Sequence, residues 1–325
     1  MSAEMEEPTK TLIRLLRNNL QVVKDDGEVA QIYIGNEWYN SEISRQNDGQ
    51  ITVALQECQE QKLSADGKVR RAILDFRINV WVLDKPERSV EAREMRDKIV
   101  DEIRRVINKR NSNPNVFTYN FIGVGRNSGD HKAFYAVSNS EPSPSSQVWT
   151  ELTDEEYTKI WYSDDERLAI TAQQDGEYAL LLLKFKLDAK PEVLKSLKLD
   201  FEGYGESPAG SGITIKIWNF STGCWDKASN SSNSLDETVS INLSSEFSSF
   251  IGDDGYVYLL ARTTNPSDGV NSAILNCDYS EMEFSVNGIC YCNVVSYRSL
   301  DIVNVRPFIW RTELYARGWM FERLI

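Results

Sequence analysis

The feature that most constrains the fold is a long alternation of apolar and polar residues over Val69–Leu83. Side chains along a β-strand point alternately to its two faces, so residues two apart share a face. One face would carry Ala72, Leu74, Phe76, Ile78, Val80 and Val82. The other would carry Arg71, Asp75, Arg77 and Asn79, with Ile73 and Trp81 as apolar exceptions. The pattern predicts a long strand with one buried face and a second face that is partly covered.

Amphipathic segments on both sides of this strand predict two helices. The first follows Pro8-Thr9, and its apolar stripe consists of Leu12, Ile13, Leu15, Leu16 and Leu20. The second runs from Ser89 to about Asn108, with Ser89 as its cap and Glu91 in its first turn. Shorter strands are expected at Gln31–Gly35, Ile51–Leu55 and Phe117–Gly125. We therefore expect an α+β domain built from an antiparallel sheet and two helices.

The composition and the secondary-structure pattern of the chain change after residue 137. The stretch Ser138–Ser146 is rich in serine and proline and is typical of a linker. Beyond it, short β-rich runs are separated by turn signals, which predicts an all-β sandwich or jelly roll. These runs are Leu168–Gln173, Glu177–Phe185, Ser196–Phe201, Ile213–Asn219, Thr238–Leu243, Tyr256–Thr263 and Met282–Val286.

The C-terminal run Ile302–Arg317 is β-like but has too little partner sequence for a core of its own. We expect it to return to the N-terminal sheet, which would make the sandwich an insertion. The predicted domains are residues 1–137 together with 288–325, and residues 147–287.

The net negative charge of the chain limits the kinds of molecule that it can bind. With 36 basic and 49 acidic residues, the chain has a net charge of −13 and repels nucleic-acid phosphates. Sequence-specific DNA or RNA binding is thereby disfavoured, whereas a channel through which DNA slides is compatible. Met1–Thr9 has no secretory pattern, and no apolar run approaches the roughly 18 residues of a membrane helix. We expect no membrane contact and a protein made in the cytoplasm.

Residues suited to catalysis or metal binding are few. The single histidine, His131, follows Asp130 in a Gly/Ser-rich turn and is expected to be exposed in a loop. Cys290 and Cys292 are too close and too isolated for a zinc site, and reduced thiols are expected. The sequence predicts no catalytic, cofactor-binding or metal-binding residue.

Two glycine-containing stretches are expected to be turns. Gly123-x-Gly125 lacks the third glycine of a dinucleotide fingerprint, and Gly252–Gly255 has only two adjacent carboxylates for a calcium loop. The tryptophans of the β module could stack on sugar rings, although packing is the favoured interpretation. They are Trp149, Trp161, Trp218 and Trp225.

The order of elements in the first domain resembles the tail-terminator (tail-completion) proteins of tailed viruses. The likeness depends on the strand Arg71–Leu83 and the helix Ser89–Ile103 and covers roughly Thr9–Asn108, with Ile302–Ile325 as a final strand pair. The resemblance implies a ring that caps the tail tube and faces the neck of the capsid. It implies neither catalytic residues nor cofactors.

Three functional hypotheses follow. The first is a virion structural protein, assembled in the host cytoplasm, whose homo-oligomeric ring joins the tail tube to the neck proteins. Its long strand and second helix would supply ring contacts, and DNA would pass through without being read. The alternative is a carbohydrate- or surface-binding β-sandwich protein. The third is a hydrolase whose paired carboxylates the sequence does not single out.

Overall fold

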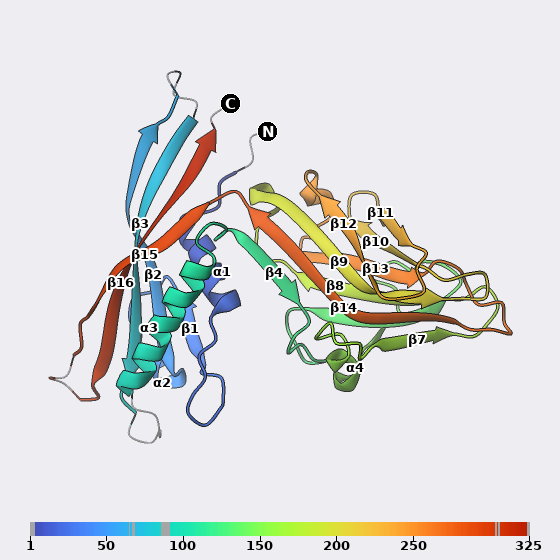
Figure 1. Ribbon diagram of the computed structural model, residues 1–325, viewed down its shortest axis with the longest axis horizontal. Coiled ribbons are helices and arrows are strands. Elements are labelled where there is room, and N and C mark those ends of the chain that lie inside the picture. Colours follow the sequence, from blue (N-terminus) through green and yellow to red (C-terminus); the bar gives the residue numbers. More distant parts are fainter. Residues whose placement is uncertain are drawn as a thin grey trace. The chain divides into compact units, whose positions relative to one another are not determined.

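A computed structural model describes residues 4–64, 66, 69–85, 92–302, 304 and 306–323. The chain forms two compact units (Figure 1), here called the first and second units. The first unit comprises Met1–Phe117 and Val286–Ile325, and the second comprises Thr118–Ser285. The second unit therefore interrupts the first in sequence. The predicted boundary at residues 137–147 lies too far along the chain, because β5 (Lys132–Ser138) pairs with β8 (Tyr178–Lys186) of the second unit.

The first unit contains a five-stranded sheet in the order β1-β2-β3-β16-β15. Its strands are β1 (Ile32–Gly35), β2 (Gly49–Lys62), β3 (Val69–Leu83), β15 (Tyr291–Ser299) and β16 (Ile309–Arg323). The expectation of a purely antiparallel sheet with two helices is wrong at one edge, where β1 runs parallel to β2. The connection between them contains the short helix α2 (Ser41–Gln46), and a crossover of this kind lets the chain enter β2 in the same direction as β1.

Two longer helices cover one face of this sheet. They are α1 (Pro8–Asn19), which starts with proline in its first turn, and α3 (Ala92–Lys109). Figure 1 shows α3 lying over the sheet, where it contacts β3, β15 and β16. The even-numbered side chains of β3 beneath the helices are buried, and Leu74 and Phe76 are 0% exposed. The predicted helix start at Ser89 and Glu91 lies outside the described residues.

The C-terminal strand completes the sheet. β16 pairs antiparallel with β3 from Ile309 opposite Leu83 to Arg323 opposite Val69. The C-terminal segment thus pairs with a strand of the N-terminal sheet, as expected, although its strand β16 begins at Ile309. Ile302, where the expected strand began, forms only an isolated bridge.

The second unit is a β-sandwich, as expected. One sheet has the order β11-β10-β13-β8-β5-β6, and the other has the order β12-β9-β14-β4 with β7 also paired to β14. Side chains such as Leu181 and Leu183 of β8 and Phe201 of β9 are 0% exposed and form the core. The remaining bounds are β4 (Val116–Asn120), β6 (Thr150–Glu151), α4 (Asp154–Thr158), β7 (Leu168–Ala172), β8 (Tyr178–Lys186), β9 (Leu194–Glu206), β10 (Ile213–Asn219), β11 (Cys224–Ser231), β12 (Glu237–Leu243), β13 (Tyr256–Thr263) and β14 (Ala273–Val286).

The predicted linker is wrong: residues 139–149 form a strap packed on the six-stranded sheet. The Nε1 of Trp225 donates to the carbonyl of Pro142, and the Nε1 of Trp149 donates to that of Ser143, both at 2.9 Å. The Glu141 carboxylate binds Lys216 and Arg262, each at 2.7 Å. Serine and proline content indicates an absence of regular structure, but it does not reveal whether distant side chains supply donors to the backbone.

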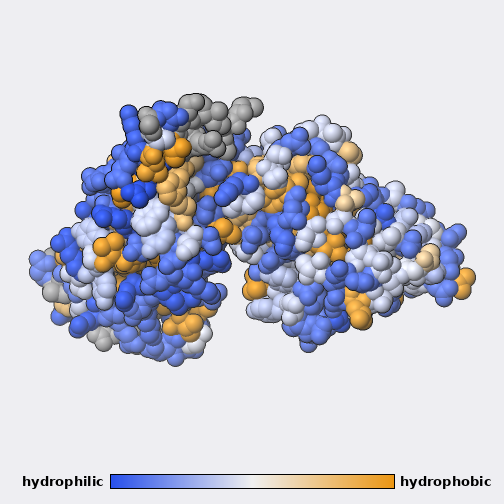
Figure 2. Space-filling model, turned by 45° about the horizontal axis from the view of Figure 1, so that its top comes forward, coloured by the Kyte–Doolittle hydropathy of each residue, from blue (hydrophilic) through white to orange (hydrophobic). Residues whose placement is uncertain are grey.

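Hydrophilic residues cover much of the surface of both units in Figure 2, with hydrophobic residues in separate patches. In the part of the chain described here, no helix combines the length and apolarity needed to cross a bilayer.

Candidate functional site

The face of the first unit's sheet opposite α1 and α3 carries a dense set of charged and aromatic side chains. Residues paired across strands share a face, so the odd-numbered residues of β3 lie beside those of β16. We call this surface the open face. It comprises Glu57, Arg71, Ile73, Asp75, Arg77, Tyr291, Arg298, Arg311, Glu313, Tyr315, Arg317, Trp319 and Phe321.

Glu313 lies at the centre of the open face and is only 2% exposed. Its carboxylate is 2.8 Å from a terminal nitrogen of Arg298, 3.2 Å from one of Arg311 and 3.3 Å from Nε of Arg77. The hydroxyl of Tyr315 also donates to it. Burial alone would raise the pKa of Glu313, but hydrogen bonds from Tyr315 and Arg298 and the nearby arginine charges lower it. Three guanidinium groups therefore surround one ionised carboxylate.

Arg311 is fixed on its other side by aromatic rings. Its guanidinium carbon is 4.3 Å from the ring centroid of Trp81 and 5.2 Å from that of Trp38. Its terminal nitrogen donates to Oδ1 of Asn79 at 2.7 Å, and the Asn79 amide donates to Thr52. Burial lowers the pKa of Arg311, because a low-dielectric environment disfavours the charged form. A polar network thus links β2, β3, β16 and β15.

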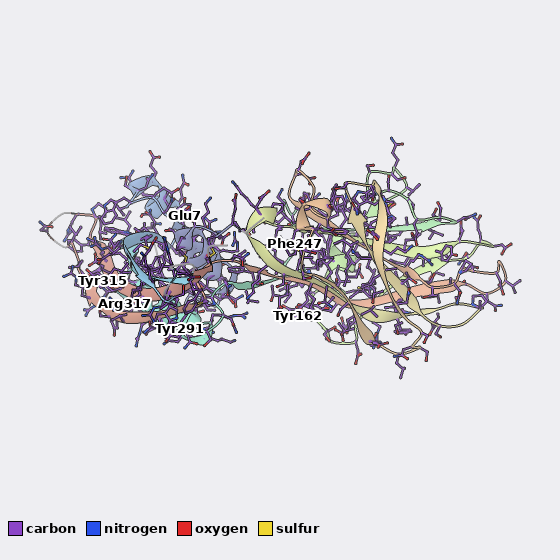
Figure 3. All side chains as sticks on the ribbon, turned by 90° about the horizontal axis from the view of Figure 1, so that it is seen from above. Glu7, Tyr162, Phe247, Tyr291, Tyr315 and Arg317 are labelled. Atoms are coloured by element: carbon purple, nitrogen blue, oxygen red, sulfur yellow. The ribbon has the colours of Figure 1, made fainter. Side chains whose placement is uncertain are left out.

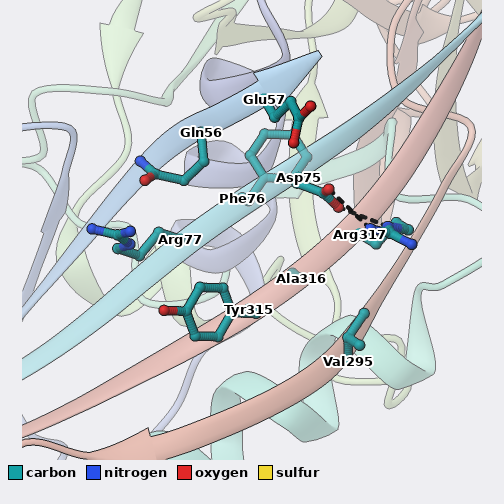
Figure 4. Close-up of a pocket in the computed structure, with 9 residues that line it drawn as sticks. All are labelled: Gln56, Glu57, Asp75, Phe76, Arg77, Val295, Tyr315, Ala316 and Arg317. Carbon is teal, nitrogen blue, oxygen red and sulfur yellow. Dashed lines mark hydrogen bonds and ion pairs between the residues drawn. The ribbon is translucent and has the colours of Figure 1, made fainter. Parts of the chain in front are cut away.

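A hollow of about 300 Å³ opens on this sheet beside the Asp75–Arg317 ion pair (Figure 4). The two side chains form a bidentate contact with distances of 2.7 and 2.9 Å, which lowers the pKa of Asp75. The two strands that flank the β3–β16 pair both bulge at this level, β2 at Gln56 and β15 at Val295. A bulge adds an unpaired residue and bends the strand, and both bulged residues line the hollow.

Aromatic residues extend the open face along β16. The rings of Trp319 and Tyr291 stack with centroids 4.2 Å apart and an interplanar angle of 13°. Phe321 is 51% exposed. Figure 3 shows Tyr291, Tyr315 and Arg317 on the same side of the first unit. The open face therefore combines arginines and aromatic rings with incomplete burial.

A separate carboxylate cluster lies in the second unit. Asp165, Asp236 and Asp278 offer oxygens within 4.8 Å of one another. Arg167 forms ion pairs with Asp165 and Asp236, and Asp278 accepts the backbone N–H of Asp165 at 3.1 Å. Burial raises the pKa of Asp278, and the charge of Asp236 adds to this effect. Arg167 neutralises part of this negative charge, and the bond from Asp165 N–H to Asp278 holds the loop before β7.

His131 is not the exposed loop residue that was expected. Its Nδ1 accepts the backbone N–H of Lys186 at 3.0 Å, and its ring lies against those of Tyr119, Phe121 and Phe185. Burial lowers the pKa of His131 and favours the neutral imidazole.

The glycine-containing stretches form turns, with a positive φ at Gly123 and at Gly255. The five cysteines are free thiols. The indoles of Trp149, Trp161 and Trp225 donate to backbone carbonyls, as the packing interpretation of these residues expects.

The sequence did not single out the open face as a site. It placed Arg71, Asp75, Arg77 and Asn79 of β3 correctly on one face. Arg298, Arg311 and Glu313 come from strands more than 200 positions further along the chain, and no strand was predicted at Arg298. The unusual charge of a long strand's second face was the only available signal.

Comparisons with known proteins give little direct information. A family model described as an uncharacterized protein, C-terminal domain, matches residues 128–285. No curated protein matches the chain. Among solved structures, the xylan-binding module CBM15 is 13% identical, with a TM-score of 0.29, covering 52% of this chain and 95% of its own.

Two further structures are similar at the same level. The enzymatically active domain of bacteriophage CBA120 tailspike protein 4 is 8% identical, with a TM-score of 0.23, covering 52% of this chain and 19% of its own. A family 11 carbohydrate-binding module from Clostridium thermocellum is also 8% identical, with a TM-score of 0.21, covering 53% of this chain and 89% of its own.

Proposed function

We propose that this protein is a virion structural protein that assembles through its first unit into a homo-oligomeric ring capping the tail tube at the head–tail junction. The resemblance of the N-terminal elements to tail terminators motivates the specific role. The observation that carries self-assembly is the open face, where arginine and aromatic side chains are ordered but incompletely buried. Arginine, tyrosine and tryptophan are enriched at the centres of protein interfaces.

The proposal is tested by electron microscopy of the purified protein in negative stain. Closed rings of uniform diameter are the expected result. Their function is then tested by mixing the rings with tail tubes from the virus that encodes the chain, where rings at one tube end are expected. Uniformly monomeric particles that leave tube ends bare would contradict the proposal.

A second candidate function, binding of carbohydrate by the second unit, is favoured by Tyr162. This ring is 50% exposed and labelled in Figure 3, and it packs edge-on against Trp161 with centroids 6.4 Å apart. The same loop leads into the carboxylate cluster, and Ser163 donates to Glu202 nearby. Aromatic rings beside carboxylates suit a sugar's apolar face and its hydroxyl groups. Binding on a glycan array that is lost in Tyr162→Ala would support this function, and unchanged binding would exclude Tyr162 as its site.

A further inference from the structure

The open face is basic in a chain that is acidic. It carries five arginines, Arg71, Arg77, Arg298, Arg311 and Arg317, against the three carboxylates Glu57, Asp75 and Glu313. The whole chain has 49 acidic and 36 basic residues. The remaining surface is therefore more acidic than the composition as a whole, and it complements the open face in charge.

The arginines of the open face are held in place before any partner binds. Arg311 lies against Trp81 and is hydrogen-bonded to Asn79. Arg298 is oriented by two contacts with Glu313, at 2.8 and 3.1 Å, while its side chain remains 61% exposed. Because these arginine side chains are already ordered, they would lose little conformational entropy when a partner binds.

The sign of the charge also restricts the symmetry of self-association. Two copies meeting open face to open face would bring arginines against arginines, which is unfavourable when water is excluded. An acidic surface elsewhere on a second copy has the opposite charge. Contacts between two different surfaces are heterologous and generate rings when the rotation closes.

We infer that the open face binds an acidic surface of a second copy of this chain, in a head-to-tail contact that repeats around the ring. This inference rests on the proposed ring function and names the surface and chemistry of its contact. Arg298 is the side chain that reaches furthest toward the partner, since it is the most exposed of the arginines that contact Glu313.

The test is sedimentation velocity of the full chain and of two matched charge reversals. Arg298→Glu changes the open face, and Arg126→Glu makes the same change at an exposed position of the second unit. We expect rings for the wild type and Arg126→Glu, and at least about tenfold weaker association for Arg298→Glu, the effect of losing one good interfacial charge contact. Circular dichroism checks that each variant folds.

The outcomes separate the inference from the function on which it rests. A monomeric wild type would contradict the ring itself. Wild-type rings that persist in folded Arg298→Glu, or that are lost equally in both variants, would overturn only the inferred contact. If Arg298→Glu does not fold, the salt dependence of wild-type assembly is measured instead. An electrostatic contact weakens strongly by about 1 M NaCl, where the screening length is roughly 3 Å. A wild-type mass that is unchanged at this salt concentration would refute the inferred contact.

Discussion

At the scale of single residues, the central feature is the carboxylate of Glu313 among three arginines. Replacing it with glutamine removes the negative charge but keeps the side-chain volume. The guanidinium groups of Arg77, Arg298 and Arg311 would then repel one another without compensation. Because these arginines are partly exposed, we expect a loss of about 1–3 kcal/mol in the free energy of unfolding rather than the larger cost of a fully buried pair.

Urea unfolding of Glu313→Gln measures this loss. Glu42→Gln, at an exposed position of α2, is the control and should change stability by less than about 0.5 kcal/mol. Equal stabilities for the two variants would show that the network contributes nothing to the fold. The same network makes stability depend on pH. Because the pKa of Glu313 is lowered in the folded protein, the network stabilises the fold at pH values above the ordinary glutamate pKa near 4.5. This stabilisation is lost as the pH falls through the lowered pKa.

Glu202, beside the carboxylate cluster of the second unit, should make stability depend on pH in the opposite sense. Burial raises the pKa of Glu202, and the charges of Asp278, Asp236 and Asp165 add to this effect. A raised carboxyl pKa means that the folded protein loses stability as the pH rises through it. We expect Glu202→Gln, which can still accept from Ser163, to be more stable than the wild type at pH 7. Melting temperatures from pH 4 to pH 8 measure the difference, and one that grows toward pH 4 would contradict this assignment.

At the scale of elements, the strap of residues 139–149 depends on two indole donors. Trp225→Phe and Trp149→Phe keep an aromatic ring but leave the carbonyls of Pro142 and Ser143 without these donors. Each loss should cost about 1 kcal/mol, and the strap should become a site of rapid proteolysis. Limited proteolysis with mass spectrometry locates the cleavage, with Trp38→Phe in the first unit as control. Cleavage no faster than in the control would contradict the proposed anchoring.

The elements also show which structural features the sequence could predict. The bounds of β3 were predicted as observed, because alternation over 15 residues leaves no competing interpretation. β11 was missed because most of its residues are polar, and β15 because the bulge at Val295 interrupts the alternation of its side chains. The strap was misassigned because its anchors, Trp225, Lys216 and Arg262, lie far along the chain. The Glu313 network was not predicted for the same reason, because its residues on β3, β15 and β16 lie far apart in the sequence.

At the scale of the whole molecule, the insertion leaves the first unit's sheet continuous. β3 and β16 pair along their full length although the entire second unit separates them in sequence. An inserted unit whose ends leave and re-enter one domain can vary without disturbing that domain's core. We therefore expect the first unit to supply assembly and the second to supply a separate surface.

The proposed ring requires that the chain self-associate through its first unit. Size-exclusion chromatography with light scattering tests it most directly, with the protein loaded over about a hundredfold concentration range, since mass action governs weak assembly. We expect a single mass that is an integral multiple of the chain mass and stays constant over most of that range. A mass equal to one chain at every concentration would contradict it.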